Sequence, residues 1–367
     1  MALAVQPFSG MAPSSPFPFV IAGPCAAESR EQVLQIARAL ALNGGVHALR
    51  AGIWKPRTRP GSFEGLGEAA LPWLKEASQL TGLPVWVEVA HPAHIGLVLK
   101  HGIQGVWIGA RTTVNPFMVE ELANALADTN LPVLVKNPVN PDLELWTGAL
   151  ERLNRKGIQQ LAAVHRGFSG FEKTVYRNTP NWQIPIELKR RFPELPILCD
   201  PSHICGHTEL IPEVAQTALD LGFDGLMIES HPDPIHALSD ARQQLKPEQL
   251  AVILQALVVR SFKVPEGMAS VRLNELRGEI DQIDAALVHL LAQRLQTIEA
   301  IGKHKLEHEL PIFQPERWNQ VLLQVRALAS ELGVEPAFIE RLFHSIHQES
   351  IEKQKAVFRN PAVQTHG

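Results

Sequence analysis

The stretch FVIAGPC (Phe19–Cys25) is a short apolar run without polar alternation, and it ends in a reactive side chain. Runs of the same kind recur at Val46–Gly52, Pro84–Ala90, Gly105–Ala110, Pro132–Asn137, Leu161–Gly167, Pro196–Asp200 and Gly225–Ser230. Strands that are buried on both faces of a parallel sheet have this composition. Segments with the apolar spacing of a helix, such as Ser29–Leu42 and Pro212–Leu221, lie between them. The sequence therefore predicts repeated strand–helix units from residue 19 to residue 262.

Eight such units in about 245 residues match an α/β TIM barrel, (β/α)8, which typically has about 250 residues. An open, doubly wound sheet is the alternative, but no glycine-rich dinucleotide-binding turn follows the first run. Residues 1–18 are rich in Pro, Ser and Phe. We expect them to form a flexible N-terminal segment, with no folded regulatory domain ahead of the first strand.

The pattern changes after the barrel. Residues 263–270 (KVPEGMAS) contain Pro and Gly without periodicity and are typical of a linker. Helical spacing then runs over 271–306, 316–332 and 336–357, which predicts an all-α domain of three helices at 271–357 and a disordered tail at 358–367. The first of these helices would be roughly 50 Å long. Two shorter helices cannot cover its apolar face, so we predict an intertwined homodimer, or a larger oligomer.

Composition excludes several kinds of partner. The net charge is −4, so the chain has no basic surplus for nucleic acid or an anionic membrane surface. Its three cysteines are irregularly spaced, which argues against a disulfide framework and favours a reducing, cytoplasmic setting. No run approaches the roughly 20 apolar residues of a membrane span, and no signal peptide is visible.

Reactive or charged residues follow nearly every predicted strand. They are Cys25, Arg50, Lys55, Arg57, Thr58, Glu88, Arg111, Lys136, His165, Arg166, Asp200, His203, Glu229 and His231. The carboxyl ends of barrel strands meet on one face, where active sites are built. Any one of these residues alone is equally typical of a solvated loop charge. Basic residues at five strand ends together predict a pocket for a ligand with several negative charges.

A second group of residues offers sulfur, nitrogen and oxygen ligands. Cys25, His203, Glu229 and Asp240 supply a thiolate, an imidazole and two carboxylates. Such a mixed set suits one divalent transition metal ion, of the Mn, Fe, Co or Zn class, better than Mg or Ca. Taken singly, Cys25 is as typical of a small buried residue, and His203 of a hydrogen-bonded loop.

Five motifs carry a family resemblance: GPC (Gly23–Cys25), KPRT (Lys55–Thr58), GAR (Gly109–Arg111), DPSH (Asp200–His203), and ESHPDP with the following LSD (Glu229–Asp240). In this order they resemble the compact type I 3-deoxy-D-arabino-heptulosonate 7-phosphate synthases. These enzymes condense phosphoenolpyruvate with erythrose 4-phosphate and release phosphate. The related 3-deoxy-D-manno-octulosonate 8-phosphate synthases are the alternative, but they carry a KAN-type motif where residues 55–57 read KPR.

The resemblance implies a role for each matching residue. The metal ligands would be Cys25, His203, Glu229 and Asp240. Phosphoenolpyruvate would be bound by Arg50, Lys55, Arg111, Lys136 and Arg166. The sugar phosphate would be bound by Arg57 and Thr58, and the catalytic residues would include Lys55 and His203. The metal would act as a Lewis acid on the aldehyde oxygen during carbon–carbon bond formation.

The helical part resembles the all-helical chorismate mutases. The resemblance rests on Leu276–Arg294 (LRGEIDQIDAALVHLLAQR), Gly302–Lys305 (GKHK) and the ES…Q ending at Glu349–Gln354. It implies that the chorismate carboxylates are bound by Arg277 of the partner chain, Arg294 and Arg317. Lys305 and Gln354 would address the ether oxygen, and Ser350 the side of the ring hydroxyl. Arg277 and Arg294 lie about 26 Å apart on one helix, so an antiparallel dimer is needed to bring them together.

The chain departs from the mutase pattern at two positions. The family usually has an acidic residue followed by an Arg-Glu pair, whereas this sequence has Gln314 and then Arg317-Trp318. Trp318 stands where a carboxylate contacts the substrate hydroxyl. Two hypotheses follow: either both domains are catalytic, or the helical domain chiefly binds chorismate or prephenate and regulates the barrel. In both cases, allosteric feedback is expected to act through the helical domain.

Overall fold

The computed structural model describes residues 3–6, 18–56, 61–171, 174–260 and 267–359. The chain divides into two compact units, residues 1–262 and 263–367, and we describe each by itself. None of the helices in the described ranges is long and apolar enough to cross a membrane.

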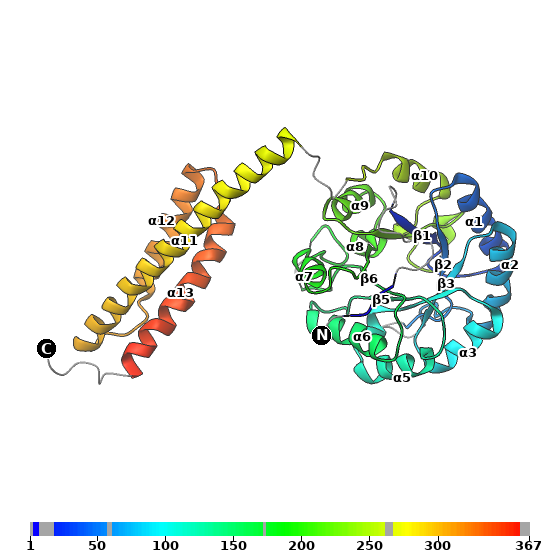
Figure 1. Ribbon diagram of the computed structural model, residues 1–367, viewed down its shortest axis with the longest axis horizontal. Coiled ribbons are helices and arrows are strands. Elements are labelled where there is room, and N and C mark those ends of the chain that lie inside the picture. The colour runs from blue at the N-terminus through cyan, green and yellow to red at the C-terminus, as the bar shows by residue number, and fades with distance from the viewer. Residues whose placement is uncertain (1–2, 7–17, 57–60, 172–173, 261–266, 360–367) are drawn as a thin grey trace. The chain divides into compact units, whose positions relative to one another are not determined.

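The first unit is a closed barrel of parallel strands (Figure 1). The strands are β1 (Phe19–Gly23), β2 (Ala48–Ala51), β3 (Val85–Val89), β4 (Gly105–Ile108), β5 (Val133–Lys136), β6 (Leu161–His165), β7 (Ile197–Cys199) and β8 (Gly225–Glu229). Each strand pairs with the next one, and β8 pairs with β1 along the whole of both strands. All eight lie within the predicted runs, so the barrel prediction is confirmed.

Helices surround the barrel, as Figure 1 shows. They are α1 (Arg30–Asn43), α2 (Leu71–Thr81), α3 (Pro92–His101), α4 (Ala110–Thr113), α5 (Pro116–Leu126), α6 (Leu143–Arg155), α7 (Gln183–Arg191), α8 (Pro201–Cys205), α9 (Ile211–Asp220) and α10 (Pro247–Ala256). Three short 3-10 turns, η1 (Gly67–Ala70), η2 (Pro234–His236) and η3 (Ala241–Gln243), complete the unit. Local residues fix several helix starts: the Ser29 hydroxyl accepts a bond from the Gln32 N–H at the start of α1.

The strands separate two apolar regions, which explains why their sequences do not alternate. One cluster joins the strands to the outer helices, and a smaller one, which includes Ile21, Trp107 and Met227, forms a separate core. Two cationic groups lie over the indole of Trp107: the Arg50 guanidinium is 5.1 Å from its ring centroid, and Lys136 Nζ is 5.9 Å from it. This core therefore ends at a cationic layer.

Four residues of the N-terminal segment differ from the flexible chain expected there. Ala4 N–H donates to the Asn154 side chain at 3.0 Å, Asn154 donates back to the Ala4 carbonyl at 2.8 Å, and Gln6 N–H donates to the Gln159 carbonyl at 2.9 Å. Leu3 and Val5 pack against the outer core. Partial burial of these two side chains and the three hydrogen bonds hold residues 3–6 on the barrel. Residues 1–2 and 7–17 lie outside the described residues.

The second unit consists of three helices: α11 (Met268–Glu307), α12 (Pro315–Glu331) and α13 (Pro336–Arg359) (Figure 1). The predicted helices are confirmed, with α11 beginning inside the expected linker and α13 continuing two residues into the expected tail. The rest of the tail, 360–367, lies outside the described residues, as do the first half of the linker, 263–266, and the last two residues of the barrel segment, 261–262. The exposed face of α11 carries large apolar side chains: Leu276, Ile280, Ile283, Leu287, Val288, Leu290 and Leu291.

Candidate active sites

The structure brings the four predicted metal ligands together at the carboxyl end of the barrel. Cys25 follows β1, Glu229 ends β8, His203 lies in α8 directly after β7, and Asp240 lies in the loop after β8. The ligand atoms of Cys25, Glu229 and Asp240 lie within 4.8 Å of one another, and Cys25 Sγ is 3.1 Å from Asp240 Oδ2. His203 Nε2 is 3.8 Å from Glu229 Oε1.

The surroundings of these ligands fit a borderline divalent cation. Asp200 contacts His203 Nδ1 at 2.9 Å, which leaves Nε2 directed toward Glu229. Burial raises the pKa of the Cys25 thiol to about 12, with Glu229 adding to the effect and the nearby Lys55 ammonium opposing it. Lys55 Nζ lies 2.8 Å from Cys25 Sγ. A bound cation would favour the thiolate instead, as the combination of sulfur, nitrogen and carboxylate donors requires.

A cationic pocket adjoins the metal set. The residues around it are Lys55, Pro56, Glu88, Arg111, Arg166, Arg177, His203 and Asp240. Arg50, Lys136 and Arg166 are buried at the same strand ends. Arg50 Nη2 lies 3.0 Å from Glu229 Oε1, and Lys136 Nζ lies 2.6 Å from Asp200 Oδ2. Basic side chains are therefore concentrated here, although the net charge of the whole chain is −4.

Buried carboxylates hold these cations in place. Burial lowers the pKa of Lys136, and Asp200 opposes that shift. Burial also works against ionisation of Asp200, yet the charges of His203, Lys136 and Arg50 hold its pKa well below the usual value. The result is a preorganised layer of paired charges that presents cationic groups to an anionic ligand.

Sequence reasoning missed Arg177 and Gln243. Arg177 Nη1 donates to Asp240 Oδ1 at 2.9 Å and to Gln243 Oε1 at 2.7 Å, and Gln243 Nε2 donates to Glu229 Oε2 at 2.7 Å. The two residues thus connect two of the proposed metal ligands. Neither directly follows a strand, so the pattern that revealed the other residues gives no signal for them.

His165 does not belong to the site, contrary to the expectation from its position at the end of β6. Its ring packs among the rings of Trp146, Phe168, Trp182 and Phe223 in the outer core. Burial lowers its pKa to about 3, so the imidazole is neutral. Successive residues of a strand point to opposite sides, and the next residue, Arg166, lines the pocket. Arg57 and Thr58 lie outside the described residues.

The helical unit gathers part of the second predicted set. Arg294 Nη1 donates to Ser350 Oγ at 2.6 Å, which joins α11 to α13. Lys305 Nζ donates to the Ile312 carbonyl at 2.6 Å, and Lys305, Ser350 and Gln354 are buried. Arg277 and Arg317 are exposed. A single chain therefore brings Arg294 and Ser350 into contact and buries Lys305 and Gln354 in the same unit.

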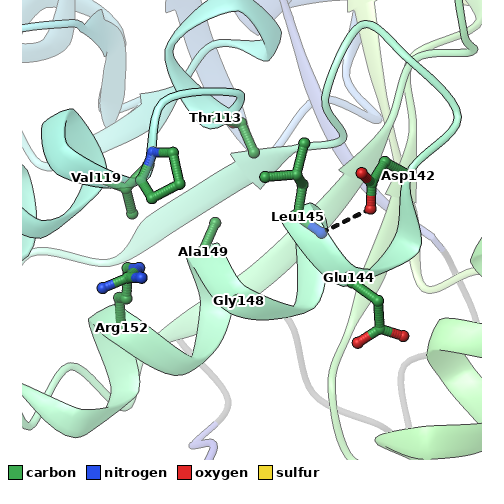
Figure 2. A pocket seen from close by; sticks show the side chains of 9 residues that line it. Thr113, Val119, Asp142, Glu144, Leu145, Gly148, Ala149 and Arg152 are labelled. Carbon is green, nitrogen blue, oxygen red and sulfur yellow. Dashed lines mark hydrogen bonds between the residues drawn. The ribbon is translucent and has the colours of Figure 1, made fainter.

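A larger cavity lies elsewhere on the barrel. It has a volume of about 300 Å³ and lies between α5 and α6, with Thr113 and Arg152 on its wall (Figure 2). Figure 2 also shows Asp142 accepting the Leu145 N–H bond that caps α6, at 2.9 Å. None of the predicted site residues lines this cavity. Its polar groups serve helix ends and surface ion pairs, as between Arg152 and Glu120.

Comparison with known proteins assigns each of the two units to a family. Residues 15–261 match the model of the DAHP synthetase I family, and residues 276–355 match that of chorismate mutase type II. A phospho-2-dehydro-3-deoxyheptonate aldolase of Thermotoga maritima is 34% identical over 238 residues, which cover 65% of this chain and 68% of that protein. A 2-dehydro-3-deoxyphosphooctonate aldolase of Nitratidesulfovibrio vulgaris is 27% identical and covers 65% of this chain and 90% of that protein.

A solved structure supports the same assignment. The crystal structure of a Thermotoga maritima phospho-2-dehydro-3-deoxyheptonate aldolase (DAHP synthase) superimposes with a TM-score of 0.62 at 32% identity, covering 69% of this chain and 72% of that one. The octonate aldolase is the more distant of the two kinds of relative. The chain therefore belongs to the DAHP synthetase I family, and it carries a chorismate mutase type II domain after the barrel.

Proposed function

We propose that the barrel condenses phosphoenolpyruvate with erythrose 4-phosphate to give 3-deoxy-D-arabino-heptulosonate 7-phosphate. The buried cationic layer beside a mixed Cys, His, Glu and Asp set carries this proposal. A phosphate and a carboxylate on one small molecule need several cations at short range, and guanidinium groups bind both in a bidentate way. Arg50 and Lys136 are buried and paired with Glu229 and Asp200, and Arg166 is buried and donates to the Asn178 side chain at 2.8 Å.

In this proposal, each of the predicted barrel-site residues has a part in the reaction. Phosphoenolpyruvate is bound by Arg50, Lys55, Arg111, Lys136 and Arg166. Arg57 and Thr58 bind the phosphate of the sugar. Cys25, His203, Glu229 and Asp240 hold one divalent ion of the Mn, Fe, Co or Zn class, which supplies Lewis acidity toward the aldehyde oxygen when bound. Asp200 keeps His203 and Lys136 oriented through its contacts of 2.9 and 2.6 Å.

Metal removal tests this site. Chelation followed by dialysis should abolish synthase activity, and addition of a divalent transition metal should restore it. Metal content must be measured in the same samples. Full activity in a sample shown to be free of metal would contradict the proposed ligand set.

The sugar specificity needs its own assay. The heptulosonate product requires a four-carbon aldose phosphate, whereas an octulosonate requires a five-carbon one. We expect kcat/KM for erythrose 4-phosphate to exceed that for a five-carbon aldose phosphate. A preference for the longer sugar would replace this proposal with the octulosonate synthase alternative.

We propose that the helical domain converts chorismate to prephenate as a homodimer. The gathering of Arg294, Lys305, Ser350 and Gln354 supports this proposal, as does the exposed apolar face of α11. The reaction is an intramolecular rearrangement, so the protein needs to hold one conformer and stabilise charge on the ether oxygen. Arg294 and Arg317, with Arg277 from the second chain, bind the carboxylates; Lys305 and Gln354 address the ether oxygen.

Trp318 supports a second candidate function, in which the helical domain is mainly a regulatory module. It stands where the family pattern has a carboxylate, and a binding module needs less of that pattern than an enzyme does. Prephenate or chorismate would then change the rate of the barrel reaction. The test is to add prephenate to the synthase assay, where an unchanged rate counts against regulation.

A further inference from the structure

The replacement at residue 318 removes an acceptor from the mutase pocket. A carboxylate accepts hydrogen bonds, whereas the indole of Trp318 offers only an N–H donor. The other polar groups gathered there are largely donors: Arg294 donates to Ser350 Oγ, and Lys305 donates to a backbone carbonyl. The remaining acceptors are Ser350 Oγ, which already accepts the Arg294 bond, and the buried Gln354 Oε1, which belongs to the side chain proposed to address the ether oxygen. A further acceptor near residue 318 would therefore compensate for the missing carboxylate.

Trp318 instead holds an imidazole. Its ring stacks on that of His347, with centroids 3.9 Å apart and planes inclined by 20°. Phe313 meets the edge of the same imidazole at 5.9 Å, and His344 meets Trp318 at 5.3 Å. Because rings on two sides fix its plane, the His347 side chain has little rotational freedom.

His347 also lies on the ligand-binding face of α13. It precedes Ser350 by three residues and Gln354 by seven, and these spacings place all three side chains on one side of a helix. Burial lowers the pKa of His347, and the positive charges of Arg294, His344 and Lys305 lower it further. The imidazole is therefore neutral near pH 7 and keeps one acceptor nitrogen.

We propose that His347 accepts a hydrogen bond from the ring hydroxyl of chorismate and so replaces the carboxylate that is missing at residue 318, with Trp318 as the residue that positions it. This inference rests on the proposed binding of chorismate by the helical domain. It assigns to Trp318 and His347 together the contact that a single acidic side chain would make.

The test compares chorismate with an analogue that lacks the ring hydroxyl, using the full-length protein. His347→Leu should lower kcat/KM for chorismate by about tenfold, the value of one hydrogen bond in a polar pocket, and leave the analogue's rate unchanged. His347→Asn, which keeps an acceptor, should recover part of the loss. His344→Leu is the matched control, since His344 lies on the same helix and contacts the same indole from its edge; it should have no ligand-dependent effect.

Calorimetric binding of the same two ligands separates this inference from the mutase proposal. If the wild type binds chorismate without converting it, the mutase proposal fails, and His347→Leu must then abolish the preference for chorismate over the analogue. Three results would overturn the role of His347. In His347→Leu, affinity or kcat/KM could fall equally for both ligands, or not fall at all. In the wild type, there could be neither binding nor conversion of chorismate.

Discussion

Asp200 is the residue on which both halves of the barrel site depend. Its Oδ2 atom lies 2.6 Å from Lys136 Nζ and 2.8 Å from His203 Nδ1, its Oδ1 atom lies 2.9 Å from the same nitrogen, and the side chain is fully buried. It also caps α8 by accepting the His203 N–H bond at 3.1 Å. One carboxylate thus fixes the Lys136 ammonium that we propose binds substrate, the ring of the proposed metal ligand His203, and the backbone N–H of that residue.

Asp200→Asn should therefore weaken metal binding and phosphoenolpyruvate binding together. The amide keeps the helix cap but loses the charge that orients His203, and loss of such a partner typically costs 10–100-fold in metal affinity. Metal titration and the KM for phosphoenolpyruvate measure the two effects. Asp142→Asn, which changes a cap on α6 away from the site, should alter neither. Unchanged metal affinity in Asp200→Asn would refute this role.

His165 makes the stability of the barrel depend on pH. Its pKa is about 3 in the folded protein, against an ordinary value of 6.5. Below pH 6.5 the unfolded chain binds a proton that the folded chain refuses, so stability falls as pH drops from 6.5 toward 3, by up to about 1.4 kcal/mol per pH unit. The free energy of unfolding, measured with urea at several pH values, should fall less steeply with decreasing pH in His165→Leu than in the wild type over that pH range. The same pH dependence in both proteins would contradict this role of His165.

The strand pattern indicates the residues at or just after strand ends, and the LSD motif indicates Asp240 in the loop after β8, but nothing in the sequence indicates Arg177 or Gln243. Cys25, Lys136 and Glu229 lie at strand ends that converge in any barrel. Arg177 reaches Asp240 from a long loop, and no local pattern encodes such a contact. His165 shows the limit of the same reasoning, since adjacent residues at a strand end face opposite sides.

At the scale of elements, the close approach of β1 and β2 sets the position of Cys25. Gly23 has φ +149°, and a Cβ there would lie 2.2 Å from the Arg50 carbonyl oxygen. Gly23→Ala should destabilise the barrel by more than about 2 kcal/mol and abolish synthase activity, because paired strands cannot separate locally. Thermal unfolding and the synthase assay provide the measurements. Gly96→Ala on α3 is the control, because a Cβ at Gly96 would have no other atom within 4 Å; it should be neutral or stabilising. Equal stability and activity of the two variants would argue against the steric requirement for glycine at residue 23.

The elements themselves followed from periodicity. Unalternating strands and amphipathic helices differ clearly in sequence, so all eight strands and the three C-terminal helices were predicted. The start of α11 was placed three residues late, because KVPEGMAS contains residues typical of a linker and gives no periodic signal.

At the scale of the whole molecule, the exposed apolar face of α11 is the basis of the predicted dimer. Ile283 and Leu287 are 54% and 53% exposed in the single chain. Ile283→Glu should give a monomer by sedimentation and abolish chorismate conversion, since Arg277 of the second chain would be lost, while synthase activity remains. Leu42→Glu on α1, which is 86% exposed, is the control and should leave the mass unchanged. A variant that remains dimeric would place the interface elsewhere.

We propose that one chain carries two separate catalytic sites. The most direct test measures both reactions on the same purified samples of the wild type, Cys25→Ala and Lys305→Ala. We predict that the wild type performs both reactions, that Cys25→Ala loses only heptulosonate phosphate formation, and that Lys305→Ala loses only chorismate conversion. A wild type that lacks either reaction, or a single substitution that abolishes both, would contradict the account.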